Sequence, residues 1–175
     1  MNIISYNVRG LRGGVKRAAI RRLVRRHKAD MLCIQETKRE QIDKAMCQAL
    51  WDDLDVGWEF MPAINTAGGL FEKGKGFILL EGVWTLENQK TYVVNIYSPC
   101  DSQNKRELWE SLKQLRQQHH EGLWCFLDDF NNVRHHFERE GVSYRGGQVN
   151  NINDFNEWIA DIECEEIPSA RASQT

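Results

Sequence analysis

The sequence predicts an α/β fold, because short apolar runs typical of buried strands alternate with longer segments of helical periodicity. The runs are bounded by polar residues or glycine and are rich in β-branched and aromatic side chains, as buried strands are. They cover residues 3–6, 31–34, 77–80, 92–97 and 123–127. Apolar side chains at helical spacing predict helices over residues 15–28, over 104–118 and from Asn151 onward.

Each predicted helix has one apolar stripe and an opposite polar face. The stripes consist of Ala19, Ile20, Leu23, Val24 and His27 in the first helix, Leu108, Trp109, Leu112 and Leu115 in the second, and Ile152, Phe155, Ile159 and Ile162 in the third. The glycine-rich segment 66–76 lacks the spacing of a phosphate loop, so we interpret it as a turn between strands.

Length and composition indicate an ordinary globular protein of one domain. The chain has 175 residues, of which 41% are hydrophobic and 27% charged, and a domain of this size buries about 70% of its unfolded surface. We expect the domain to span residues 1–167, followed by a small polar tail at 168–175. Apolar runs are too short to span a membrane and no signal segment is evident, which favours an intracellular location.

The five cysteines are scattered and odd in number, with no C-x-x-C pair or Cys/His spacing suited to zinc. We therefore expect free thiols. The formal net charge of −2 gives no overall attraction to polyanions, so any such binding must come from local clusters of basic residues.

Polar side chains follow four of the predicted strands where each strand ends. These are Asn7, Glu36, Tyr97, and Asp129 with Asn131. Open α/β sheets place their functional sites at the carboxyl ends of strands, and Mg²⁺ needs only one or two protein carboxylates. We therefore expect these side chains to meet around one metal ion and one phosphate. Taken singly, each is more often a solvated loop residue or the start of an Asx turn.

Four motifs in a fixed order resemble the signature of the endonuclease/exonuclease/phosphatase superfamily. They are SYNVRGL at 5–11, IQETK at 34–38, NIYSP at 95–99 and DFN at 129–131. Within the superfamily, NVRGL, the basic helix after it and DFNNVRHHFEREG most resemble the endonuclease domain of plant non-LTR (long interspersed element) retrotransposons. The resemblance implies a four-layer sandwich of two mixed β-sheets flanked by helices.

The resemblance also implies roles for the residues at the strand ends. Glu36 and Asn7 would surround Mg²⁺, with Mn²⁺ as an alternative, and Tyr97 would contact the phosphate. Asp129 and Asn131 would position the attacking water. The family reaction nicks DNA and leaves a 3′ hydroxyl.

Two features depart from the family pattern. Asp128 replaces the family glycine, which puts a second carboxylate beside Asp129 and raises the cost of ionising both. The Ser-Asp-His motif of the family's final strands does not occur in the sequence, so we expect those strands to be missing and catalysis to be impaired. His135 and His136 are substitutes that we consider poor on geometric grounds.

Basic residues suggest two surfaces for DNA. One is the helix at 15–28, although a charged helix is usually only a solvated face. We favour instead the loops near the strand ends, which carry Arg9, Arg134, Arg139 and Arg145.

Three functions remain open from the sequence. The first is a Mg²⁺-dependent DNA endonuclease domain of retrotransposon origin, a nuclear monomer whose parent element also carries a reverse transcriptase. The second is a catalytically inactive retroelement remnant or DNA-binding module. The third is a phosphatase of inositol phosphates or phospholipid headgroups.

Overall fold

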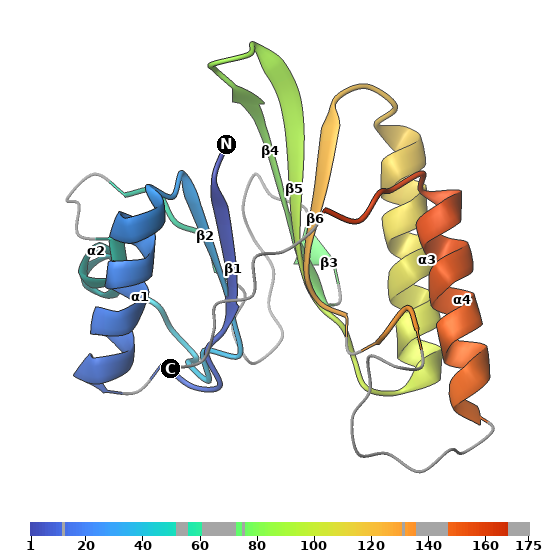
Figure 1. The fold of residues 1–175 in the computed structure, drawn as a ribbon, viewed down its shortest axis with the longest axis horizontal. Helices are drawn as coiled ribbons and strands as arrows, with labels where there is room; N and C mark the ends of the chain where they lie inside the picture. The colour runs from blue at the N-terminus through green and yellow to red at the C-terminus, as the bar shows by residue number, and fades with distance from the viewer. Residues whose placement is uncertain are drawn as a thin grey trace. The chain divides into compact units, whose positions relative to one another are not determined.

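The computed structural model describes residues 1–11, 13–51, 56–60, 73–74, 76–130, 132–135 and 147–167. It confirms the α/β class, with two β-sheets and four helices (Figure 1). The described chain forms two compact units. Unit 1 holds Met1–Cys100 and Glu121–Asn131, and unit 2 holds Asp101–His120 and Asn132–Thr175.

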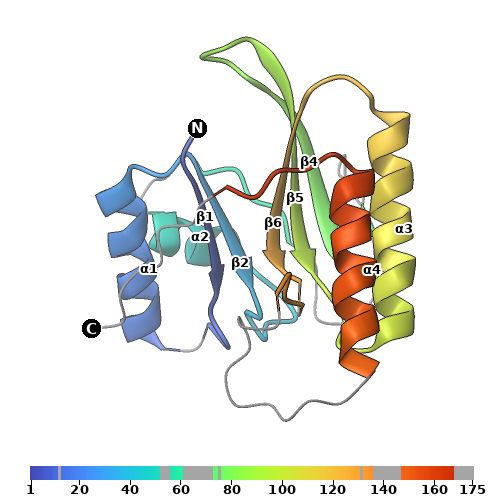
Figure 2. The ribbon, with the colours of Figure 1, turned by 45° about the vertical axis from the view of Figure 1, so that its right-hand side comes forward.

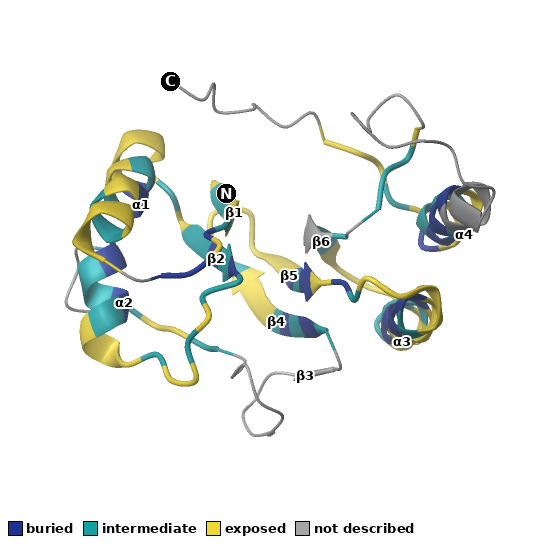
Figure 3. Cartoon of the chain, turned by 90° about the horizontal axis from the view of Figure 1, so that it is seen from below, coloured by how far each residue is buried: buried dark blue, intermediate teal, exposed yellow. Residues whose placement is uncertain are grey.

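The first sheet of unit 1 consists of two parallel strands, β1 (Ile3–Asn7) and β2 (Met31–Gln35). They are connected by helix α1 (Gly14–His27), and helix α2 (Lys44–Trp51) follows β2. Both helices pack on one face of this sheet through a buried cluster of Val8, Leu11, Ile20, Val24 and Leu50. The predicted stripe of the first helix is correct for Ile20 and Val24, whereas Ala19 and His27 are exposed, as Figure 3 shows for much of α1.

The second sheet has the strand order β3 (Lys73–Gly74), β4 (Phe77–Trp84), β5 (Gln89–Tyr97) and β6 (Leu123–Asp129). β3, β4 and β5 are antiparallel neighbours, whereas β5 and β6 run parallel. The predicted turn at 66–76 lies mostly outside the described residues. Its part at 73–74 is a short strand, because it pairs with Phe77 and Ile78 of β4.

The two sheets of unit 1 meet through alternate residues of β2. Leu32 and Ile34 pack toward the helices, so Cys33 and Gln35 belong to the other face by the two-residue period of a strand. Gln35 donates a hydrogen bond to Asn95 of β5. Burial raises the pKa of the Cys33 thiol to about 12, with a smaller contribution from Cys125 of β6. All five cysteines are free thiols.

Unit 2 is built from helices α3 (Ser102–Gln118) and α4 (Gly147–Asp161). Asp101 caps α3 because its carboxylate accepts a hydrogen bond from the Asn104 backbone N–H at 2.9 Å. The predicted apolar face of α3 is buried and packs on α4, where the Trp158 indole donates to the Trp109 carbonyl at 3.0 Å.

Two ion pairs show that these helices run in the same direction. Arg106 pairs with Asp154 at 2.9 Å, and one helical repeat later Lys113 pairs with Asp161 at 2.6 Å. In the described part of the chain, none of the helices combines the length and apolar character needed to cross a membrane.

Candidate active site

The carboxyl ends of four strands of unit 1 come together at one end of its sheets. Register pairs Asn7 of β1 with Gln35 of β2, and Tyr97 of β5 with Asp129 of β6. The arrowheads of these four strands point to the same end in Figure 2. The convergence expected from the sequence is therefore present at the level of the backbone.

Gln35 joins the two pairs of strands. Its side chain is 4% exposed, and its Nε2 donates to Ser5 Oγ and to Asn95 Oδ1, each at 2.8 Å. Both amide N–H donors are therefore satisfied inside the protein. Because Asn95 precedes Tyr97 by two residues on β5, this bond brings the end of β2 close to the end of β5. Sequence reasoning gave Gln35 and Asn95 no role.

Asn7 and Glu36 are in direct contact, as the predicted site requires. Asn7 Nδ2 donates to Glu36 Oε1 at 3.0 Å, and Asn7 Oδ1 accepts from the Arg9 backbone N–H at 3.1 Å. A backbone N–H only donates and an ionised carboxylate only accepts, so this pair of bonds fixes the amide orientation. Asn7 thereby orients the Glu36 carboxylate, whose Oε2 makes no hydrogen bond to any residue that the structure describes.

The backbone at this end of the first sheet is strained. Glu36 has a φ of 51°, Lys38 of 53° and Arg9 of 46°, all in the left-handed region that residues other than glycine rarely adopt. Each such residue costs about 1–3 kcal/mol, and such costs cluster at functional sites. No sequence pattern could have revealed this strain, because none of the three residues is glycine.

Tyr97 ends β5 with a side chain that is partly accessible. It is 43% exposed, and its backbone N–H donates to the Gly76 carbonyl at 2.8 Å. Tyr97 and Asn95 are two residues apart and therefore share the face of β5 that meets β2. The phenol is thus placed on the side of the sheet where Glu36 lies.

The remaining predicted residues are distributed differently. Arg9 is exposed and adjoins Asn7. Arg134 belongs to unit 2, where its guanidinium binds the side chains of Asn156 and Glu166, each at 3.2 Å. His135 is exposed. The side chain of Asp129, and Asn131, His136, Arg139 and Arg145 as a whole, lie outside the described residues.

The donor chemistry at Asn7 and Glu36 fits a hard divalent cation such as Mg²⁺. Glu36 offers a carboxylate oxygen that no described residue occupies, and Mg²⁺ binds through one or two carboxylates while it keeps several waters. Among the described residues, no group of three or more His, Cys, Asp or Glu side chains gathers in a way that could hold a metal ion.

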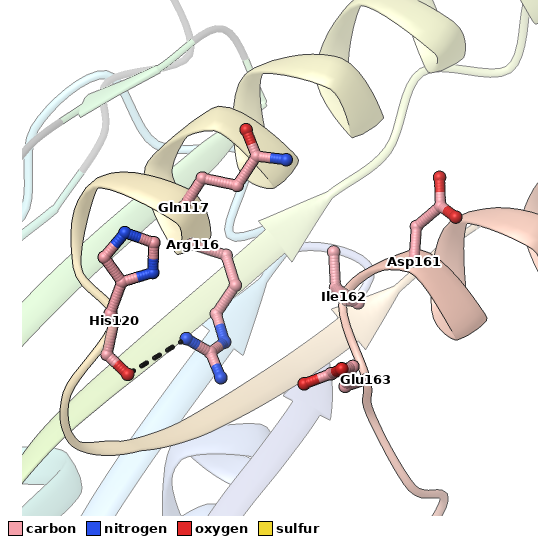
Figure 4. A pocket seen from close by; sticks show the side chains of 6 residues that line it. All are labelled: Arg116, Gln117, His120, Asp161, Ile162 and Glu163. Atoms are coloured by element: carbon pink, nitrogen blue, oxygen red, sulfur yellow. Dashed lines mark hydrogen bonds between the residues drawn. The ribbon is translucent and has the colours of Figure 1, made fainter.

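Unit 2 contains an open cavity of about 250 Å³ at the carboxyl ends of its helices (Figure 4). Its lining includes Arg116, whose guanidinium donates to the backbone carbonyls of His119 and His120, each at 3.4 Å. Of the predicted site residues that the structure describes, none lines this cavity.

Comparison with known proteins decides the family. The model of the endonuclease/exonuclease/phosphatase family matches residues 4–125. The chain belongs to this family. The match includes Asn7, Glu36 and Tyr97 and ends before Asp129.

One curated protein is also similar to this endonuclease/exonuclease/phosphatase chain. An exodeoxyribonuclease of Bacillus subtilis (strain 168) is 26% identical over 139 residues, which cover 73% of this chain and 52% of that protein. The chain thus spans about half the length of the curated relative it matches.

Proposed function

We propose that the chain carries a Mg²⁺-dependent phosphodiesterase domain that nicks DNA and leaves a 5′ phosphate and a 3′ hydroxyl. The observation that carries the proposal is the Asn7–Glu36 hydrogen bond at the strand ends. Membership of the family and the similarity to an exodeoxyribonuclease support a phosphate ester in DNA as the substrate.

In this proposal each residue has one task. Glu36 would hold the cation through the carboxylate that Asn7 orients. Tyr97 would donate a hydrogen bond from its phenol to a non-bridging phosphate oxygen, and Asp129 with Asn131 would position the attacking water. A bound Mg²⁺ would stabilise the charge that develops on the phosphate and on the leaving oxygen.

We further propose a retrotransposon origin, supported by the likeness of NVRGL and DFNNVRHHFEREG to non-LTR endonuclease domains. The 3′ hydroxyl left by such a nick would serve as the primer for a reverse transcriptase of the parent element. The protein would then act in the nucleus, where its target DNA lies.

A second candidate is a DNA-binding module without catalysis. One observation favours it: no Ser-Asp-His triplet occurs in the 175 residues. General acid/base catalysis contributes about 10² to 10⁴ in rate, so these 175 residues taken alone would bind DNA and turn it over slowly or not at all.

The test is a nicking assay on supercoiled plasmid with Mg²⁺ or with EDTA. We expect Glu36→Gln to lower the Mg²⁺-dependent rate by about 10² or more, the loss that follows removal of a group stabilising charge in the transition state. Asp129→Asn should have a similar effect. Glu40→Gln is the matched control, because Glu40 is exposed and has no partner among the described residues.

Nicking that persists unchanged in Glu36→Gln and Asp129→Asn would disprove the proposed site. If the wild type binds duplex in a mobility-shift assay and does not nick it, the DNA-binding module is the better description. Release of phosphate from inositol phosphates, with no nicking, would instead identify the phosphatase alternative.

A further inference from the structure

The side-chain ammonium of Lys16 binds three consecutive backbone carbonyls. Its Nζ lies 2.9 Å from the oxygen of Val8, 3.3 Å from that of Arg9 and 3.1 Å from that of Gly10. An ammonium group has three N–H donors and no acceptor. Lys16 in the first turn of α1 thus uses all its donors on the loop between β1 and α1.

The backbone of this loop explains why three carbonyls converge on one point. Arg9 has a φ of 46° and Gly10 a φ of 97°, so two successive residues are left-handed. The N–H groups of Val8, Gly10 and Leu11 face the other way and donate to the carbonyls of residues 35, 36 and 37 at 3.1, 2.7 and 2.9 Å. The loop therefore binds the end of β2 on one side and a cation on the other.

We infer that the carbonyls of Val8, Arg9 and Gly10 form a site for a monovalent cation, which the Lys16 ammonium fills, and that Lys16 is a positioning residue for Asn7 and Glu36. Without a cation, three carbonyl dipoles would point at one another at close range. Their repulsion would favour opening of the loop.

The connection to the candidate active site is a short series of hydrogen bonds. The Arg9 N–H holds Asn7 Oδ1, and the Gly10 N–H holds the Glu36 carbonyl. When the loop opens, both bonds are lost, and the Glu36 carboxylate loses the amide that orients it. This second half of the inference rests on the proposed function, whereas the cation site itself does not.

The first experiment measures hydrogen exchange at the backbone amides of Gly10 and Leu11 by NMR. We expect Lys16→Met to lower their protection by about tenfold or more, since it removes charged hydrogen bonds that hold the loop closed. Lys44→Met is the matched control. Lys44 is also exposed in the first turn of a helix and has no partner among the described residues.

A second variant tests for a cation site rather than a packing contact. Lys16→Ala leaves room at the carbonyls, so K⁺ should restore the protection of Gly10 and Leu11. Tetramethylammonium at the same concentration should not, because its methyl groups cannot approach the oxygens. Unchanged exchange in Lys16→Met, or equal restoration by both salts, would overturn the cation site.

The positioning role is tested by Mg²⁺ titration of the nicking rate. Lys16→Met should raise the Mg²⁺ concentration for half-maximal rate by about 10- to 100-fold, as loss of the support of a metal ligand does, with the rate recovering at saturating Mg²⁺. An unchanged titration alongside altered exchange would refute the positioning role alone. If the wild type does not nick, the proposed function fails, and the exchange experiment still decides on the cation site.

Discussion

Gln35 Nε2 donates a 2.8 Å hydrogen bond to Asn95 Oδ1, and this bond joins the two sheets of unit 1 at the end where the candidate site lies. Asn95→Ala would leave a donor of the buried Gln35 amide without its partner. We expect the free energy of unfolding, measured in urea, to fall by about 1–3 kcal/mol. The nicking rate should also fall, because Tyr97 follows Asn95 on the same face of β5.

Gln89→Ala is the control for Asn95→Ala, since Gln89 lies at the other, exposed end of β5. Its stability and activity should match those of the wild type. Equal losses of stability and activity in the two variants would contradict this prediction. They would mean that any polar residue of β5 contributes as much as the hydrogen bond between the sheets.

Gly10 should tolerate no side chain without a loss of stability. Its φ of 97° is unfavourable for any L residue, although an added Cβ would meet only Lys38 Cδ at 3.7 Å, an ordinary contact. We therefore expect Gly10→Ala to cost about 1–2 kcal/mol from backbone strain alone. Gly14→Ala, which lies in α1 with open space around its Cα, should be neutral or stabilising by up to about 1 kcal/mol. Urea unfolding of both variants measures the difference.

Arg9 should contribute more to DNA binding than the basic face of α1. It is exposed and adjoins Asn7, whereas Arg22 is exposed in the middle of α1. We expect Arg9→Glu to weaken duplex binding and to reduce the salt slope by about one phosphate contact. Fluorescence anisotropy at several salt concentrations should show little change for Arg22→Glu. The reverse order of effects would assign the DNA surface to α1.

Asp128 should be dispensable for nicking, although the family has glycine at its position. Register pairs Asp128 with Ile96 and Asp129 with Tyr97. Alternate residues of a strand belong to opposite faces, so we expect Asp128 to lie on the face away from the site. Asp128→Gly should therefore nick at the wild-type rate. A gain of tenfold or more would show instead that the extra carboxylate impairs the reaction.

Alkaline pH should destabilise unit 1 through the buried thiol of Cys33. Burial, with Cys125 as the smaller cause, raises the pKa of this thiol from 9.0 to about 12. The folded protein keeps a proton that the unfolded chain releases, so the contribution to stability is complete below pH 9.0 and is lost as the pH rises toward 12. The loss is at most about 1.4 kcal/mol per pH unit.

The measurement is urea unfolding at a series of pH values above 9.0, for the wild type and for Cys33→Val. The variant lacks the proton in question and should show a shallower decline. Cys100→Ser is the control, because Cys100 is exposed, and its curve should parallel that of the wild type. Identical slopes in all three proteins would assign the alkaline loss to other groups.

Much of the fold followed from local patterns in the sequence. The apolar runs predicted β1, β2, β4, β5 and β6, because buried strands need continuous apolar character. Helix α2 and strand β3 were missed. α2 has only 8 residues and β3 only 2, so each segment is too short to show a recognisable periodicity of apolar residues.

The contact between Asn7 and Glu36 was predictable from the sequence, whereas the residues that support it were not. Asn7 and Glu36 were expected to meet because polar residues at the ends of parallel strands share one edge of a sheet. Gln35 resembles a surface residue in the sequence, and only the packing of two sheets makes it a buried connector. The role of Lys16 depends on the left-handed backbone at Arg9. This conformation could not be predicted from the sequence, because Arg9 is not a glycine.

Unit 1 is discontinuous in sequence, since it takes Met1–Cys100 and then Glu121–Asn131. A fragment ending at Cys100 would lack β6 and would leave Val93 and Val94 of β5, 3% and 0% exposed, beside an empty strand position. Removing chain from either terminus therefore cannot yield unit 1 alone. Because β5 and β6 run parallel, Cys100 follows the carboxyl end of β5, whereas Glu121 precedes the amino end of β6 at the opposite end of the sheet. Any linker that replaced residues 101–120 would therefore have to run back along the whole length of β6 before it reached Glu121.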